Sequence, residues 1–236
     1  MSDIAYFSIV GVVMLFSLAI RAKLKSTYAK WGRTRNSAGI TGAQGARTIL
    51  NADGMPGVRL EAVSGQLADH YDPRANTIRL SADVYSVPSV AALAIAAHET
   101  GHALQGHLHY RPMVLKTTLV PLAVQGARFG IPLALLGSIL GSELLVQVGV
   151  LGYAGALVLQ FIALPVEFDA SKRALHELGR LNLISAEETE PVKAVLRAAA
   201  MTYVGAAASS APICCTWASR SDVGCSVGPR LEGRKR

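Results

Sequence analysis

Charged and aromatic residues are scarce in this chain of 236 residues. Asp, Glu, Lys and Arg make up 17% of it and Phe, Trp and Tyr 6%, whereas globular proteins carry about 25% charged residues. Hydrophobic residues reach 51%, and the mean hydropathy is +0.34. This balance is too apolar for an ordinary soluble protein and predicts membrane spans. The net charge of +7 does not indicate nucleic-acid binding, because the basic residues gather beside an apolar segment.

Cysteine is nearly absent. Cys214, Cys215 and Cys225 all lie close to the C-terminal end, far in sequence from the histidines. They match no zinc-ligand spacing and do not establish an oxidising compartment.

The first apolar run covers residues 4–20, carries no charge and is just long enough to span a bilayer as a helix. A cleaved signal peptide is the alternative, but no A-x-A-like site follows the run. The residues that do follow are basic: Arg21, Lys23, Lys25, Lys30, Arg33 and Arg35. By the positive-inside rule, the chain enters the cytoplasm at residue 21. Residues 1–35 are therefore predicted to be a transmembrane anchor with a basic juxtamembrane stretch.

The sequence HETGH at residues 98–102 has the pattern HExxH and follows a small, apolar, helix-forming segment. Two histidines four residues apart lie on one face of a helix, so His98 and His102 are candidate ligands of one Zn²⁺ ion. Glu99 lies at the flank of that face and is the candidate catalytic base for a water molecule at the metal. The alternative, two unrelated histidines beside a solvated glutamate, leaves ionisable groups unsatisfied on an apolar helix.

Two apolar stretches follow this helix. Residues 117–141 are interrupted by Gln125 and Arg128, and residues 144–164 carry no charge. Joined by a short connection, they predict a transmembrane hairpin near residues 117–164. Its even number of crossings returns the chain to the side of the membrane on which the histidines lie.

Two carboxylates, Glu167 and Asp169, come directly after this hairpin, where Pro165 predicts the start of an amphipathic helix. A zinc ion held by two histidines needs a third protein ligand, and a later glutamate on a second helix is a common solution. We therefore prefer Glu167 as the ligand and expect Asp169 to hold a histidine or a nearby cation. The alternative is that both are helix-start carboxylates that face the helix dipole.

Four other polar residues are weaker candidates for the site. His70, His107 and His109 fit structural or solvated loop positions more readily than metal ligands. Tyr203 could donate a hydrogen bond to a developing oxyanion, but it fits a core or interfacial position more readily.

The remaining segments contribute to the fold. Residues 58–63 and 77–81 alternate in polarity and predict two strands, and a strand just before the zinc helix could offer its edge to an extended peptide. Residues 205–236 are rich in small and polar residues, lack helical periodicity and predict an irregular tail.

Several segments in order resemble the YugP-like family of neutral zinc metallopeptidases in bacterial membranes. They are the N-terminal span with its basic stretch, DHYDPRANTIRLS, SVAALAIAAHETGHALQ, PVEFDASKRAL and AVLRAAAMTYV, and they cover about residues 1–204. The resemblance implies a membrane-anchored zinc endopeptidase with His98, His102 and Glu167 as ligands and Glu99 as base and acid. Relatives look as though they end in one more apolar helix, from which the tail of this chain diverges.

The prediction is a mainly α protein with a small β element (α+β), a multi-span membrane protein with a zincin-like HExxH helix at the membrane face. Residues 36–204 form the metallopeptidase domain, which includes the transmembrane hairpin, and the active site lies on the cytoplasmic side of a bacterial inner membrane. Its substrates are membrane-associated proteins or peptides. One alternative is an intramembrane-type protease, for which the apolar run at residues 90–97 is too short. The other is an inactive zinc-binding scaffold, which would normally supply four protein ligands.

Overall fold

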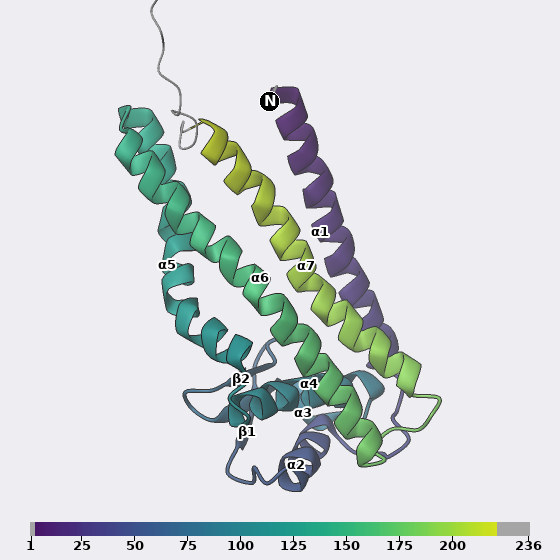
Figure 1. The fold of residues 1–236 in the computed structure, drawn as a ribbon. Helices are drawn as coiled ribbons and strands as arrows, with labels where there is room; N and C mark the ends of the chain where they lie inside the picture. The colour runs from purple at the N-terminus through teal and green to yellow at the C-terminus, as the bar shows by residue number, and fades with distance from the viewer. Residues whose placement is uncertain (1–2, 221–236) are drawn as a thin grey trace, which may run out of the picture.

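A computed structural model describes residues 3–220 of the chain. Four long helices form one part of the molecule, and the shorter elements gather at one end (Figure 1). This confirms the prediction of a mainly helical protein with a small sheet. In chain order the elements are α1 (Asp3–Trp31), α2 (Gly42–Ala52), β1 (Arg59–Val63), β2 (His70–Asp72), β3 (Thr77–Ser81), α3 (Ala82–Ser86), α4 (Val90–His107), α5 (Arg111–Leu140), α6 (Glu143–Arg180) and α7 (Thr189–Arg220).

Helices α5 and α6 form an antiparallel hairpin. Gly141 ends α5 with φ 65°, a left-handed conformation that suits glycine. The two helices approach closely, because a Cβ atom at Gly130 would lie 2.7 Å from the carbonyl oxygen of Gly149. Among the described residues, these are the two helices found long and apolar enough to cross a membrane, and little of their apolar surface is buried within the protein.

The predicted helix start at Pro165 is wrong. Helix α6 runs without a break from Glu143 to Arg180. A proline inside a helix removes one backbone hydrogen bond, but α6 packs against α4, α5 and α7, and this packing outweighs the loss. Glu167 and Asp169 therefore lie inside a helix and are not helix-start carboxylates.

The prediction of an irregular tail is wrong for residues 205–220, which continue α7 as far as Arg220. Small residues let α7 approach α1 closely: a Cβ atom at Gly205 would lie 2.9 Å from Cδ1 of Ile20, and Ser209 Oγ lies 2.6 Å from Ser17 Oγ. Close packing of small residues stabilises a helix pair without the apolar periodicity on which the prediction depended. Residues 221–236 of the predicted tail lie outside the described residues.

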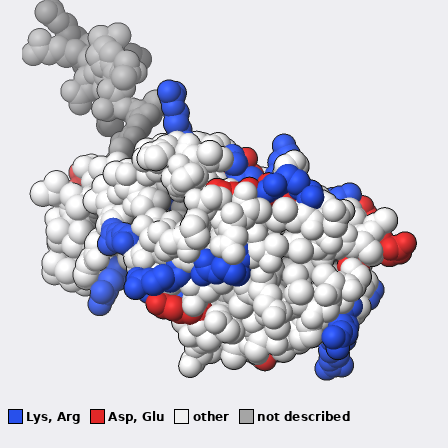
Figure 2. Space-filling model, turned by 90° about the horizontal axis from the view of Figure 1, so that it is seen from below, with Lys and Arg blue, Asp and Glu red and all other residues white. Residues whose placement is uncertain are grey.

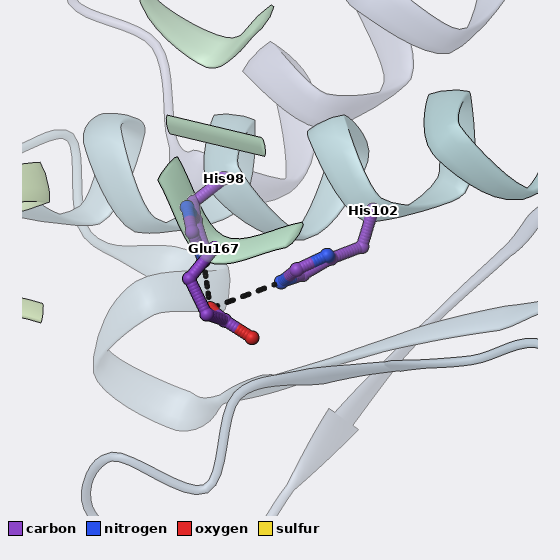
Figure 3. Close-up of side chains that lie close together, drawn as sticks. All are labelled: His98, His102 and Glu167. Atoms are coloured by element: carbon purple, nitrogen blue, oxygen red, sulfur yellow. Dashed lines mark hydrogen bonds and ion pairs between the residues drawn. The ribbon is translucent and has the colours of Figure 1, made fainter. Parts of the chain in front are cut away.

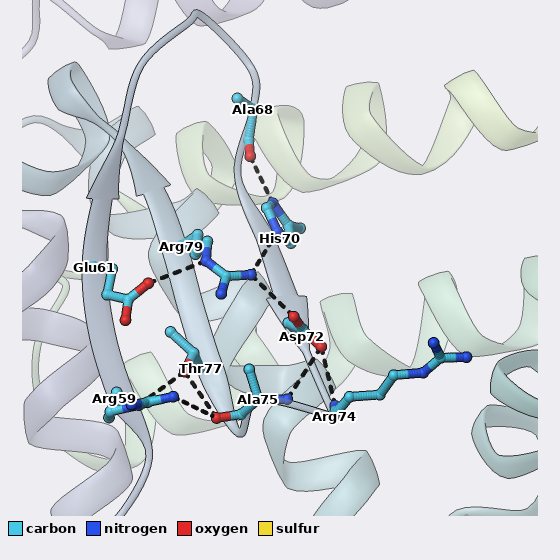
Figure 4. Close-up of polar contacts among 9 residues, drawn as sticks. All are labelled: Arg59, Glu61, Ala68, His70, Asp72, Arg74, Ala75, Thr77 and Arg79. Carbon is cyan, nitrogen blue, oxygen red and sulfur yellow. Dashed lines mark hydrogen bonds and ion pairs between the residues drawn. The ribbon is translucent and has the colours of Figure 1, made fainter.

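The sheet has the strand order β1-β3-β2, with β1 parallel and β2 antiparallel to the central strand β3. Arg79 of β3 ties the strands together, because its guanidinium donates to Glu61 of β1 at 3.1 Å and to Asp72 of β2 at 3.0 Å (Figure 4). Ile78 and Leu80 of the same strand are fully buried in the core. The edge strand β2 was not predicted, because three residues are too few to display alternation.

Helix α4 is the central element of this end of the molecule. Ser89 caps it by accepting a hydrogen bond from the backbone N–H of Ala92 at 3.1 Å. All its side chains between Val90 and Gln105, except Ile95, are buried, as expected of a helix that is apolar on every side. It packs against α2, α6 and α7, which fixes the position of its histidines relative to α6.

Candidate metal centre

Two histidines of α4 and one glutamate of α6 meet at a single point. His98 Nε2 lies 3.3 Å and His102 Nε2 3.4 Å from Oε2 of Glu167 (Figure 3). One possible ligand atom from each residue lies within 4.8 Å of the other two, and all three residues are buried. The structure thus brings together the three residues predicted as metal ligands, although 64 residues separate His102 from Glu167 in the sequence.

This arrangement fits a zinc ion. Zinc binds imidazole nitrogen and carboxylate oxygen at about 2.0–2.2 Å, so two donors at tetrahedral positions lie about 3.4 Å apart. The two nitrogen–oxygen separations, 3.3 and 3.4 Å, already match that spacing. Two imidazoles and one carboxylate are also the donor set of known catalytic zinc sites, which leave a fourth position for water.

Each histidine is held by a hydrogen bond on its other ring nitrogen. His98 Nδ1 lies 3.2 Å from Ser171 Oγ, and His102 Nδ1 lies 2.9 Å from Gln105 Oε1. Because the amide oxygen of Gln105 can only accept, His102 Nδ1 carries a proton, and Nε2 is the ring nitrogen that can bind a metal once it is deprotonated. The hydrogen bonds therefore turn both Nε2 atoms toward Glu167.

Gln105 also joins the two helices. Its amide nitrogen donates to the carbonyl oxygen of Val166 at 2.8 Å and to Asp169 Oδ2 at 2.9 Å, and Arg173 Nε donates to the same carboxylate oxygen at 2.6 Å. Asp169 thus contacts a nearby cation, as expected, and reaches His102 only through Gln105. Gln105 was not predicted, although its position three residues after His102 places both on one helix face.

Lys116 of α5 completes the group. Its Nζ lies 2.7 Å from Oε1 of Glu167, so this cation and the histidines contact different oxygens of one carboxylate. Its side chain also approaches the ring of Tyr203, with Nζ 5.5 Å from the ring centroid. No sequence spacing indicates Lys116, because it comes from a third helix.

Burial and neighbouring charges set the protonation of the two glutamates. Burial raises the pKa of Glu99 from 4.5 to about 7; the charge of His98 opposes this and the charge of Glu167 adds to it. Burial alone would also raise the pKa of Glu167, but hydrogen bonds from His102 and His98 hold it well below its ordinary value. Glu167 is therefore an anion suited to a metal, whereas Glu99 is poised to exchange a proton near neutral pH.

The other histidines do not join the group. His70 Nδ1 lies 2.8 Å from the carbonyl oxygen of Ala68, and its Nε2 lies 3.5 Å from Arg79 (Figure 4). His107 is the last residue of α4, and His109 is an exposed turn residue with φ 51°. Tyr203 is partly buried and lies in the wall of the cavity at the site.

The three metal-ligand candidates and Glu99 open into a cavity of about 710 Å³. One side of it is formed by residues 69–74, which include the edge strand β2, and other sides by α5 and α7. A cavity of this size holds several residues of a polypeptide or a small molecule of similar volume.

Replacing Gly101 with Ala should disturb the centre without changing any polar group. A Cβ atom at Gly101 would lie 2.5 Å from the carbonyl oxygen of Ala170 on α6, so α4 and α6 must move apart. We expect a loss of about 1–3 kcal/mol in unfolding free energy. Zinc affinity, measured by competition with a chromophoric chelator, should fall at least about tenfold.

Gly106→Ala on the same helix is the matched control, because its Cβ atom would make only ordinary contacts with Tyr71, at 3.5 Å or more. Equal zinc affinity in the Gly101 and Gly106 variants would contradict the proposed role of close helix packing.

Comparison with known proteins places the chain in a family. Residues 6–219 match the family described as "Putative neutral zinc metallopeptidase". The chain is 42% identical over 186 residues to the "Putative membrane protease YugP" of Bacillus subtilis (strain 168), an alignment that covers 78% of this chain and 82% of the relative. No solved structure matches. The resemblance seen in the sequence is thereby confirmed, and the family match extends beyond residue 204 into the end of α7.

Proposed function

The chain belongs to this family of zinc metallopeptidases, and from that premise we propose that it is a membrane-bound, zinc-dependent endopeptidase. The observation that carries the proposal is the convergence of His98, His102 and Glu167 on one buried point beside a cavity. In the proposal these three residues hold the zinc ion, and Glu99, next to His98 on α4, serves as the general base.

The proposed reaction is the addition of water to a peptide bond. When bound, Zn²⁺ would polarise the scissile carbonyl and make a water molecule more acidic. Glu99 accepts a proton from the water, whose oxygen forms the new bond to the carbonyl carbon. Glu99 then donates this proton to the leaving nitrogen as the carbon–nitrogen bond breaks. A pKa raised by burial suits a group that must both accept and release a proton.

We further propose that the protein is a multi-pass protein of a bacterial inner membrane, with α5, α6 and the apolar part of α1 as spans. Lys, Arg, Asp and Glu side chains are spread over the end of the molecule that carries the site (Figure 2), whereas α5 and α6 expose mainly apolar side chains. Basic residues at the site end of the long helices favour a cytoplasmic site by the positive-inside rule. They are Arg21, Lys23 and Lys25 of α1, Arg111 of α5, and Lys172 and Arg173 of α6.

Two other functions fit less well. An intramembrane protease would carry its zinc helix as a span, but α4 packs among α2, α6 and α7 at the end where the sheet lies. A scaffold with structural zinc would normally close the site with four protein ligands, and the group found among residues 3–220 has three.

The direct test uses the purified full chain in liposomes and a mixed peptide library read by mass spectrometry. We expect cleavage by the zinc-loaded protein, loss of cleavage with a zinc chelator and recovery when Zn²⁺ is added back. Stoichiometric zinc without cleavage of any peptide or membrane protein would instead favour the scaffold.

A further inference from the structure

The cavity at the site has walls of two different kinds. Near the metal centre it is polar, with His98, Glu99 and Glu167 together with the segment of β2. The rest of the lining is mostly apolar, with Gln125 of α5 as a polar exception, and comes from three helices: Leu24 of α1, Val120 and Val124 of α5, and Val195 and Leu196 of α7. This apolar lining offers a surface that suits apolar side chains of a substrate.

The apolar wall extends into the predicted membrane span. Thr117, Val120 and Val124 line the cavity and, at spacings of three and four, form one face of α5. The glycine-lined face of α5 that contacts α6, around Gly130, is a different face. From Lys116 to Val124 the wall rises about 12 Å at 1.5 Å per residue, and Val124 is 53% exposed.

The same face continues to Arg128, four residues after Val124 and exposed in the middle of an apolar helix. An arginine at that depth is costly against lipid and normally faces a protein interior or a water-filled space. This position indicates that the cavity face of α5 does not border ordinary lipid along its whole length.

The cavity lies between α5 and the α1–α7 pair, because Leu24 of α1, Val120 of α5 and Val195 of α7 all line it. Helix α5 packs along α6, and α7 packs along α1 and α6. In the part of the chain that the structure describes, α5 makes no comparable contact with α1 or α7. The long helices lead away from the short elements (Figure 1), so a segment that reached the apolar wall from within the membrane would pass between α5 and the α1–α7 pair.

On these grounds we propose that the substrate is a polypeptide embedded in the membrane, which enters the cavity sideways between α5 and the α1–α7 pair. This inference rests on the proposed peptidase function and names its substrate class. The apolar segment of the substrate lies against Val120 and Val124, and the peptide bond that is cut lies next to Glu99. Because an extended chain covers about 3.3–3.6 Å per residue, the roughly 12 Å from Lys116 to Val124 is spanned by about three to four residues, so the cut bond lies within a few residues of the apolar segment.

The test uses one cleavage sequence, chosen from the peptide library, in defined substrates within liposomes. It is placed 4, 12 or 24 residues outside a synthetic transmembrane segment, with Gly-Ser spacers, and is also supplied as a soluble peptide. We expect cleavage of the 4-residue substrate to exceed that of the 12-residue substrate at least tenfold. Simple tethering to the membrane predicts only a shallow decline with spacer length, because local concentration falls slowly.

A bulky substitution tests the route itself. Val124→Trp should lower the ratio of membrane-embedded to soluble cleavage at least fivefold. Val148→Trp is the matched control: Val148 is 49% exposed on α6, similar to Val124, and does not line the cavity. The control should leave the ratio unchanged.

The outcomes separate the two proposals. Cleavage of the soluble peptide at the same rate as every tethered substrate, or equal ratios for the Val124 and Val148 variants, would overturn sideways entry and leave the peptidase function in place. Absence of all cleavage by the zinc-loaded protein would overturn the peptidase function and this inference with it.

Discussion

Glu99→Gln is expected to lower kcat/KM for peptide hydrolysis about a thousandfold, within the range for loss of a general base, while zinc stays bound in stoichiometric amount. Gln keeps the size of the side chain but cannot accept a proton at neutral pH. Zinc should stay because Glu99 is not one of the three converging donors. The measurements are single-turnover cleavage and metal content of the same preparation.

Glu177→Gln is the matched control, because Glu177 is 8% exposed and Glu99 7%, and Glu177 lies outside the cavity. It should cleave at the wild-type rate. Cleavage within tenfold of wild type by the Glu99 variant would remove Glu99 from its assigned role.

The pH dependence of kcat/KM in the wild-type protein also tests whether Glu99 is the general base. Burial raises the pKa of Glu99 to about 7 in the metal-free protein, and a bound divalent cation would favour the carboxylate and lower this value. Glu99 must be ionised to accept a proton, so kcat/KM should fall as the pH drops through a value between 4.5 and about 7. The residual kcat/KM of the Glu99 variant should not show this fall at low pH.

Glu167→Gln is expected to weaken zinc binding by at least about a hundredfold, the upper range for loss of a residue that only supports a metal ligand. The substitution replaces an anion with a neutral amide beside two imidazoles. It also leaves Lys116, whose Nζ lies 2.7 Å from Glu167, as an unpaired cation near the centre, which disfavours a second cation. Competition with a chromophoric chelator measures the change.

The Glu99 variant is the control for this experiment, because it should keep zinc while losing activity, whereas the Glu167 variant should lose both. Unchanged zinc affinity in Glu167→Gln, with thermal unfolding like that of the wild type, would show that the three residues converge for another reason.

Much of the fold could be predicted from local patterns. The apolar stretches at residues 117–141 and 144–164 have the length and composition of long helices, and the structure has α5 and α6 there. Helix α4 could be predicted because its residues are small and apolar on every side, which is typical of a buried helix. Failures came where tertiary packing overrides a local signal: Pro165 lies inside α6, and the small residues after Gly205 form a helix by packing on α1.

The metal centre, too, could be predicted only in part from the sequence. The spacing of His98 and His102 within one helix is a property of the chain, since a helix places residues four apart on one face whatever surrounds it. Glu167 could be preferred on topology and on the need for a third ligand, but its distance from the histidines could not be calculated from sequence.

The sequence by itself therefore determined the two histidines, the neighbouring carboxylate and the apolar character of the helices around them, because these depend on local periodicity and composition. Only the tertiary structure decided that Gln105 and Ser171 orient the imidazoles, that Lys116 contacts Oε1 of Glu167, and that α1, α5 and α7 line one cavity. The contacts of Ser171 with His98 and of Lys116 with Glu167 join different helices, and Gln105, which contacts His102 within α4, also reaches Val166 of α6. They depend on how close two backbones can approach, as at Gly101 and Ala170, which no pattern within a single helix records.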